Sequence, residues 1–315
     1  SLIELAWFLR VVPSEMNSNK PYVDAALALL GVDRLVLAIH DQSFPASSAE
    51  EMGRGSPYGE GGRRFAGFIK DLGFNALQLG PQGKTTLANP SPYDSTLFSK
   101  NELSISLLSL AQDAAWAKLL DVEDVTSLVE HAPSADAPRD RRSYEYAWQA
   151  QFQALRKVYE NFVARTEPLK YIRLAYINWT SLHAVWLDRD SLFEALSIEY
   201  GTDDWRQWAV LDQSLFGGGA PTSPEQIDRV SSVRAKYASE IDFFQFCRFI
   251  AHQQHLEFRE FAATLKLKLY ADLQIGFSQR DMWALRHLLL SNYSLGAPPS
   301  RTNPDGQPWG YPVLD

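Results

Sequence analysis

Short apolar runs on either side of a helical stretch define the first unit of structure, from residue 35 to 79. The runs are LVLAIH (residues 35–40) and NALQLG (75–80), and both have the length of a strand. The segment between them places its apolar residues on one helical face: Phe65, Phe68, Ile69 and Leu72. Gly73 follows, where a left-handed residue commonly ends a helix. A strand, a helix and a strand joined by short connections predict two parallel strands.

From about residue 103 to 264 the apolar positions recur mainly at helical spacing. One such stripe is interpreted as core: Trp148, Phe152, Leu155, Tyr159 and Phe162. Asp190 is expected to cap a helix that ends at Gly201. Ser223 to Gln226 fits a capping box with proline in the first turn. The tract after it is predicted to turn further apolar residues to the core: Ile241, Phe244, Phe249 and Ile250.

A third strand is predicted within residues 267–277, in LKLYADLQIGF. The chain is therefore expected to contain three buried parallel strands, with a large helical insertion between the second and the third. Such an order opens either an α/β barrel or a doubly wound sheet. The stretch RDMWALRHLLL reads as helical, and the proline- and glycine-rich residues 296–315 show no periodicity of helix or strand. A stiff irregular loop that presents Trp309 is predicted there.

Composition and charge exclude several classes of protein. With 45% apolar residues, 22% charged residues and a net charge of −8, the chain fits a soluble globular protein and not one that binds nucleic acid. No apolar run is long enough to span a membrane, and residues 1–17 lack the features of a signal peptide. The single Cys247 excludes an internal disulfide, is expected to be buried, and suits a reducing compartment, so a cytoplasmic location is expected.

Neither a metal nor an organic cofactor is predicted. His252 and His255 have a spacing that could hold a metal on a helix, but no third ligand is evident nearby, and an ordinary helical face is favoured. The glycines of SPYGEGGRR do not have the spacing of a nucleotide-binding loop, and no nucleophile-elbow motif occurs.

Candidate chemistry gathers where the predicted strands end. In parallel α/β folds ligands bind at the carboxyl ends of strands, and three segments lie there: HDQSFP (residues 40–45), residues 80–95, and the segment that begins at Asp272. We expect His40, Gly80 and Asp272 to share one rim. His40 itself is interpreted as a packed residue. The mixture of aromatic, Asp and Gln residues suits a polyhydroxylated ligand, whose apolar ring faces stack on aromatic side chains.

Several motifs resemble the 4-α-glucanotransferases called amylomaltases or disproportionating enzymes, of the α-amylase clan. The motifs are LGPQGKTTLANPSPYDS, LYADLQIG and GAPPSRTNPDGQPWGYPVLD, and the similarity extends in order over nearly the whole chain from about residue 35. The resemblance implies a (β/α)8 TIM barrel. It also implies transfer of an α-1,4-glucan segment between maltooligosaccharides, by a retaining mechanism through a covalent glycosyl-enzyme.

The same resemblance implies roles for individual residues. Tyr93 would stack on a glucose ring, Asp272 would support the site from the third strand, and Trp309 would line the substrate groove. Three residues of the same motifs are further substrate-binding candidates: Ser91, Gln307 and Gly310. The chain departs from many family members after the strand-three aspartate, where it has Gln274 and Gly276, and after Gly-Ala-Pro-Pro, where it has Ser300 and Arg301.

The domain organisation follows from the same comparison. Residues 1–34 are expected to form a tail or the end of an appended module, 35–102 the first two barrel strands, 103–240 the helical insertion, and 241–315 the third strand and a groove loop. The nucleophile and acid/base are expected beyond residue 315, with the rest of the barrel, in a longer chain or a second fragment. The chain alone is then inactive. The alternatives are a catalytically silent glucan-binding protein of the same fold or, more remotely, a helical interaction protein.

Overall fold

The computed structural model describes residues 20–133, 141–165 and 167–315, which form two compact units. The first unit holds the described residues up to Gln82 together with Asn101–Ile172 and Ile250–Asp272. The second holds Gly83–Lys100, Arg173–Phe249 and Leu273–Asp315. Of the predicted N-terminal segment, residues 1–19 lie outside the described residues, and the rest contains helix α2 (Lys20–Leu30).

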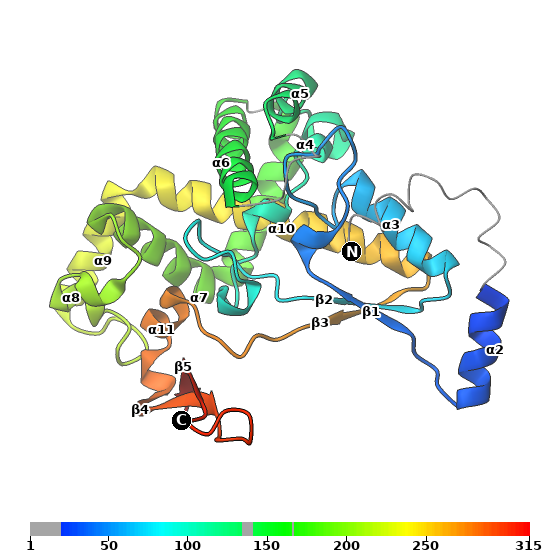
Figure 1. The fold of residues 1–315 in the computed structure, drawn as a ribbon. Coiled ribbons are helices and arrows are strands. Elements are labelled where there is room, and N and C mark those ends of the chain that lie inside the picture. The colour runs from blue at the N-terminus through cyan, green and yellow to red at the C-terminus, as the bar shows by residue number, and fades with distance from the viewer. Residues whose placement is uncertain (1–19, 134–140, 166) are drawn as a thin grey trace. The chain divides into compact units, whose positions relative to one another are not determined.

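A parallel three-stranded sheet organises the first unit. Its strands are β1 (Val36–Ile39), β2 (Ala76–Leu79) and β3 (Lys268–Ala271), in the order β1-β2-β3 (Figure 1). Both pairs are parallel and in step, so that Ile39 lies beside Leu79 and Leu79 beside Ala271. The strand–helix–strand prediction and the third parallel strand are confirmed.

Helix α3 (Glu60–Asp71) and the end of α10 (Ala238–Thr264) supply the core that holds this sheet. The core residues are Phe44, Tyr58, Phe65, Ala66, Ile69, Leu77, Leu79, Phe258, Ala262 and Leu267. Gly73 lies just past the end of α3 in a left-handed conformation, with a φ of +103°, as predicted. Only β2 is a buried strand, because β1 and β3 are edges that expose Val36 and Tyr270. The expectation of three buried strands was wrong for those two.

Between β2 and β3 the regular elements of the described residues are helices. In the first unit they are α4 (Leu107–Gln112), α5 (Val122–Glu130) and α6 (Arg141–Ala164), with short 3₁₀ turns at Glu102–Ser104, Ala114–Trp116 and Glu167–Leu169. A further 3₁₀ turn, Asp41–Ser43, lies between β1 and α3. The aromatic stripe of α6 is buried at Leu155, Tyr159 and Phe162, while Trp148 and Phe152 are half-buried. The interpretation of this stripe as core therefore holds for its second half.

The second unit is mainly helical. It contains most of α7 (Lys170–Tyr200), then a 3₁₀ turn at Trp205–Gln207, α8 (Val210–Gln213), α9 (Pro224–Lys236), the start of α10 and α11 (Gln279–Ala284). Its core gathers Leu192, Phe193, Leu196, Trp205, Trp208, Leu215, Val230, Val233 and Trp283. The predicted capping box at Ser223 and Gln226 is present, and Cys247 is buried as expected.

The predicted helix start at Asp190 is wrong. Helix α7 runs without interruption from Lys170 to Tyr200, and Asp190 is a buried residue inside it. Its carboxylate accepts a hydrogen bond from Ser99 Oγ at 2.7 Å, not from the first turn of a helix. The end of the same helix was predicted correctly, because Gly201 follows it at a φ of +66°.

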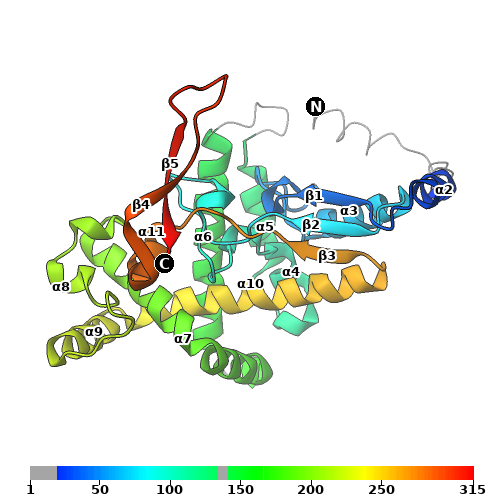
Figure 2. The ribbon, with the colours of Figure 1, turned by 90° about the horizontal axis from the view of Figure 1, so that it is seen from below.

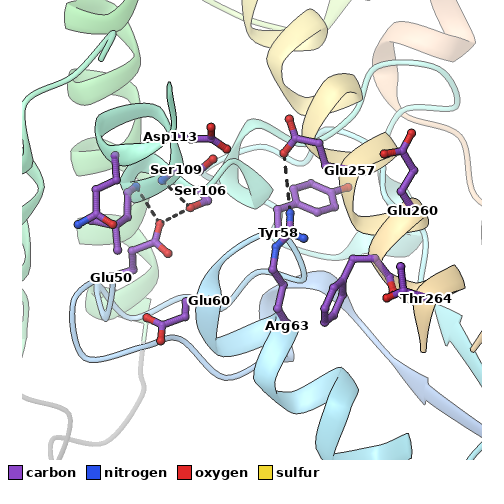
Figure 3. A pocket seen from close by; sticks show the side chains of 13 residues that line it. Glu50, Tyr58, Glu60, Arg63, Ser106, Ser109, Asp113, Glu257, Glu260 and Thr264 are labelled. Carbon is purple, nitrogen blue, oxygen red and sulfur yellow. Dashed lines mark hydrogen bonds and ion pairs between the residues drawn. The ribbon is translucent and has the colours of Figure 1, made fainter. Parts of the chain in front are cut away.

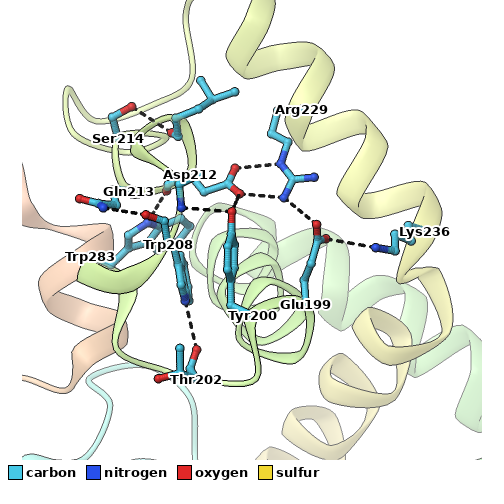
Figure 4. Close-up of polar contacts among 12 residues, drawn as sticks. Glu199, Tyr200, Thr202, Trp208, Asp212, Gln213, Ser214, Arg229, Lys236 and Trp283 are labelled. Carbon is cyan, nitrogen blue, oxygen red and sulfur yellow. Dashed lines mark hydrogen bonds and ion pairs between the residues drawn. The ribbon is translucent and has the colours of Figure 1, made fainter.

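An ionic network around buried Asp212 joins α7, α8 and α9 (Figure 4). Arg229 donates from Nε and Nη2 to the two carboxylate oxygens of buried Asp212, at 2.8 and 2.7 Å. Tyr200 donates to the same carboxylate at 2.7 Å. Glu199 accepts from Arg229 at 3.0 Å and pairs with Lys236 at 3.6 Å. These bonds, mainly that with Asp212, raise the pKa of Arg229 above its usual value.

Residues 289–314 form an antiparallel hairpin, whereas an irregular loop was predicted for residues 296–315. Its strands are β4 (Leu289–Ala297) and β5 (Gln307–Leu314), as Figure 2 shows. The preceding helix is correspondingly shorter than predicted, because α11 ends at Ala284 and a 3₁₀ turn covers Arg286–Leu288. Prolines are tolerated in β5 because every strand of a two-stranded sheet is an edge, and the register shifts twice along the pair. No helix among the described residues is long and apolar enough to cross a membrane.

Candidate functional site

In the first unit, His40, Gly80 and Asp272 lie side by side at the carboxyl end of the sheet. Each residue directly follows its strand, and the ladder continues into them: the Gly80 N–H donates to the Ile39 carbonyl and the Asp272 N–H to the Leu79 carbonyl, both at 3.1 Å. The predicted shared rim is confirmed. The Asp272 side chain is half-buried there.

A buried polar group adjoins the first strand at this rim. The carboxylate of buried Asp41 accepts two hydrogen bonds from Gln82 Nε2, at 3.0 and 2.9 Å, and one from Ser104 Oγ at 2.9 Å. Gln82 also donates to the Tyr58 hydroxyl at 3.2 Å. Burial, with Asp41 nearby, raises the pKa of Tyr58 well above its usual value, which keeps the phenol protonated. Sequence reasoning did not find Gln82 or Tyr58, whose partners are distant in the chain.

His40 packs closely against this backbone. A Cβ added to Gly80 would lie 1.9 Å from His40 Nδ1, so the imidazole occupies the space that any side chain at residue 80 would need. Gly80 is therefore required by this close approach. The contact agrees with the interpretation of His40 as a packed residue.

An open pocket of about 710 Å³ lies elsewhere in the first unit, between the start of α3, the α4 region and α10 (Figure 3). Five of the residues that line it carry carboxylates: Glu50, Glu60, Asp113, Glu257 and Glu260. Burial, aided by Asp113 and Glu260, raises the pKa of Glu257, whereas Arg63, at 3.8 Å, opposes the rise. None of the predicted site residues lines this pocket. Within the described part of the chain no group of three or more His, Cys, Asp or Glu could hold a metal ion.

In the second unit, Tyr93 stands at the tip of the loop formed by residues 83–100, here called the SPY loop. A 3₁₀ turn over Pro92–Asp94 leaves 45% of Tyr93 exposed. Ser91 precedes the turn, and its N–H donates to Asn89 Oδ1 at 3.0 Å. Asn89 Nδ2 in turn donates to the Asp94 carboxylate at 2.9 Å. The tip is thus a turn with its own hydrogen bonds and an aromatic ring that faces solvent.

Strand β5 carries the other three predicted residues of the second unit. Trp309 is 46% exposed, and its Nε1 donates to Gln307 Oε1 at 3.4 Å. Gly310 has a φ of +73°, and a Cβ added there would meet no atom of the described residues within 4 Å. Glycine is needed at residue 310 for its backbone conformation and not for space. Trp309 is thus presented by a strand and not by the irregular loop that was predicted, and its role stays a prediction.

Gly276 is where the tip of the SPY loop meets β5. A Cβ added to Gly276 would lie 2.6 Å from the Tyr93 carbonyl oxygen, 2.9 Å from Cε1 of Tyr311 and 3.0 Å from Asp94 Oδ1. A hydrogen bond between Tyr311 and the Asp94 carboxylate raises the pKa of the Tyr311 phenol. Asp94 and Tyr311 were not predicted, and no local pattern marks them.

The predicted site residues therefore fall into two groups, one in each unit. Ser91 and Tyr93 are linked to the strand of Gln307, Trp309 and Gly310 through the contact of Asp94 with Tyr311. Asp272 lies in the first unit, on the rim with His40 and Gly80. Gln274, which follows it in the chain, donates to the Ser95 carbonyl at 3.2 Å inside the second unit. Exposed aromatic rings beside amide and carboxylate groups are the elements that bind sugar rings.

Comparison with known proteins points to one family. The family described as 4-alpha-glucanotransferase matches residues 43–315. A 4-alpha-glucanotransferase of Aquifex aeolicus is 26% identical over 275 residues, which are 82% of this chain and 50% of that protein. One from Mycobacterium tuberculosis (strain H37Rv) is 29% identical over 259 residues, 78% of this chain and 32% of that protein.

Solved structures share the fold. The amylomaltase from Streptococcus agalactiae, in complex with acarbose, superposes with a TM-score of 0.71 at 18% identity, over 90% of this chain and 53% of that one. The chain spans about half of the length of the Aquifex aeolicus relative and about a third of that of the Mycobacterium tuberculosis relative.

Proposed function

The chain belongs to the 4-alpha-glucanotransferase family, and on this premise we propose that it supplies glucan-binding parts of an enzyme that transfers α-1,4-glucan segments between maltooligosaccharides. The fold is α/β of the TIM-barrel type, as in the amylomaltases that it resembles. We infer that β1, β2 and β3 are the first three strands of a (β/α)8 barrel, with residues 103–240 as an insertion. Their common register and parallel order support this assignment.

The half exposure of two aromatic side chains, Tyr93 and Trp309, is the observation that carries the proposal. Tyr93 and Trp309 are both large, half-exposed rings; Tyr93 lies in a turn that has its own hydrogen bonds, and Trp309 lies in strand β5. A half-exposed aromatic loses little conformational entropy on binding and covers the C–H face of a pyranose ring. In this proposal Tyr93 and Trp309 stack on glucose rings, while Ser91, Gln307 and Asp272 bond sugar hydroxyls. Gly310 supplies the backbone turn that orients Trp309.

The chemistry of transfer requires two carboxylates about 5 Å apart, one as nucleophile and one as acid/base, in a retaining mechanism. The predicted candidates of this chain are binding residues, and Asp272 alone among them is a carboxylate. Because the chain covers only 50% of the Aquifex aeolicus relative, we assign the nucleophile and the acid/base to residues outside these 315. The chain by itself then binds glucan without cleaving it. We also propose that the enzyme needs no cofactor and acts in the cytoplasm.

Transfer activity is tested with the full-length natural protein and maltotriose. We expect a ladder of longer maltooligosaccharides together with free glucose, because each transfer lengthens one glucan and shortens another. Chromatography of the products over time measures this. Maltotriose that stays unchanged would favour a silent glucan-binding protein, and glucose with maltose but no longer products would indicate simple hydrolysis.

The binding role of Tyr93 is tested in the 315-residue chain with maltoheptaose. We expect Tyr93→Ala to weaken affinity roughly 5- to 20-fold, the loss of about 1–2 kcal/mol that one stacked aromatic contributes. The matched control is Tyr171→Ala, which removes a tyrosine that is 84% exposed on α7. Isothermal titration calorimetry measures both. Equal affinities for the two variants would remove Tyr93 from the binding site.

A further inference from the structure

The SPY loop has an exposed tip and a deeply buried base. Tyr93 faces solvent, whereas four polar residues near the base are buried: Lys84, Thr85, Thr96 and Ser99. The two ends of the loop pair with each other, because Gly83 and Lys100 form an antiparallel bridge and the Lys84 N–H donates to the Ser99 carbonyl at 2.7 Å. The Thr96 hydroxyl closes the base further, since it donates to the Ser99 carbonyl at 2.6 Å and accepts from the Lys84 N–H at 2.9 Å.

Buried carboxylates of α7 and α11 accept hydrogen bonds from the base of the loop. Asp190 of α7 accepts from Ser99 Oγ at 2.7 Å. Asp281 of α11 accepts from the Leu97 N–H at 3.1 Å and from Ser278 Oγ. Asp190 and Asp281 are completely buried. Two carboxylates on two different helices thus accept hydrogen bonds from Leu97 and Ser99 of one loop.

The cations of this region complete the arrangement. Arg280 is buried, pairs with Glu194, and its Nη1 lies 3.4 Å from Ser99 Oγ. Its guanidinium also lies over the rings of Phe193 and Phe244, 5.3 and 4.8 Å from their centroids. Lys84 of the loop approaches Glu194 at 3.8 Å. The set Lys84, Asp190, Glu194, Arg280 and Asp281 is here called the anchor cluster.

Such a cluster is a costly way to stabilise a fold. Buried ion pairs seldom contribute more than well-packed apolar groups of the same volume, because their desolvation cancels most of the attraction. Among the described residues, Asp281 Oδ1 has no hydrogen-bond partner, so part of this cost is not offset. Hydrogen bonds to buried charges are directional and therefore fix the geometry of the groups that they join. Such a fixed geometry matters where a binding residue must be held in one orientation.

We propose that the anchor cluster, through Asp190 and Asp281, positions the SPY loop so that Tyr93 at its tip meets the glucan in a fixed orientation. These carboxylates are positioning residues and do not touch the sugar. The inference rests on the proposed function, because the ligand of Tyr93 is the glucan. A loose base lets the tip sample many orientations, and binding must then order the loop at a cost in affinity.

The test compares maltoheptaose affinity and amide hydrogen exchange of the 315-residue chain at a temperature where each variant is folded. Asp281→Ala removes the acceptor of the Leu97 N–H, and we expect affinity to fall about tenfold and exchange in residues 95–100 to quicken. Asp281→Asn keeps an acceptor oxygen and is expected to restore affinity to within about threefold of wild type. Ser99→Ala, which removes the donor to Asp190, is measured in parallel in case Asp281→Ala does not fold.

The matched control is Asp212→Ala, which removes an equally buried carboxylate of the same unit whose bonds go to Tyr200 and Arg229. It is expected to lower stability while leaving maltoheptaose affinity unchanged. Wild-type affinity in both Asp281→Ala and Ser99→Ala, with weakened binding in Tyr93→Ala, would overturn the inference and leave the proposed function standing. A wild-type chain that does not bind maltoheptaose would overturn the proposed function itself, and with it this role.

Discussion

Replacing Arg229 with Met is expected to lower the free energy of unfolding by about 3–5 kcal/mol, because it leaves the buried Asp212 carboxylate without its bidentate partner. Met keeps most of the length and apolar volume of the Arg stem, so the loss reports the ionic contact and not a cavity. Of the described residues, the Tyr200 hydroxyl then remains to bond the carboxylate. Urea unfolding followed by circular dichroism measures the change.

Arg234→Met is the control for this prediction. Arg234 lies on the same helix, but its ion pair with Asp188, at 3.5 Å, is about half exposed on both sides. An exposed pair contributes about 0–1 kcal/mol, so this variant is expected to unfold at nearly the wild-type urea concentration. If both variants lost equal stability, the Asp212 network would not be the main link between α8 and α9.

Asp281→Asn is expected to stabilise the protein above pH 7, and the gain is expected to vanish in acid. Burial, with Asp190 nearby, raises the pKa of Asp281 from an ordinary 3.8 to about 6. The folded state therefore holds a proton that the unfolded state has already released between these two values. Ionisation of Asp281 thus weakens folding as pH rises through 6, by roughly 3 kcal/mol in all. Asn has no ionisation cost and bears no charge towards Asp190.

The measurement is the difference in unfolding free energy between Asp281→Asn and wild type at pH 4, 6 and 8. It is expected to be smallest at pH 4, where Asp281 is largely protonated in the folded state, and to grow to on the order of 1–3 kcal/mol at pH 8. A difference that does not change with pH would show that Asp281 does not titrate in this range. Together with retained glucan binding in the same variant, the expected result would separate the charge of Asp281 from its hydrogen bond to the SPY loop.

Some elements were predictable because their signals are local. The apolar runs that became β1, β2 and β3, and the capping box at Ser223 and Gln226, each depend on residues a few positions apart. Asp190 shows the limit of such reasoning. A carboxylate before a good helical segment reads as a cap, yet burial against Ser99, far away in the chain, places it inside a continuous helix. Tertiary contact overrode local preference.

The prediction of an irregular loop for residues 296–315 was wrong for a related reason. Their prolines and glycines suppress the alternation that marks a strand, and only the pairing of β4 with β5 reveals the hairpin. Sequence motifs singled out Tyr93 and Trp309, which are half exposed in the structure, but the contact of Tyr311 with Asp94 beside Gly276 was found only in the structure.

The amino-acid sequence alone therefore determined the family, the parallel strands and the rim on which Asp272 stands, because apolar spacing, helix ends and short motifs act over a few neighbouring residues. Only the tertiary structure decided which polar groups meet. The contact of Tyr311 with Asp94, and the hold of Asp190 and Asp281 on the SPY loop, join segments that are remote in the chain. Such pairs depend on how helices and strands pack, and packing is set by the whole core rather than by any local pattern.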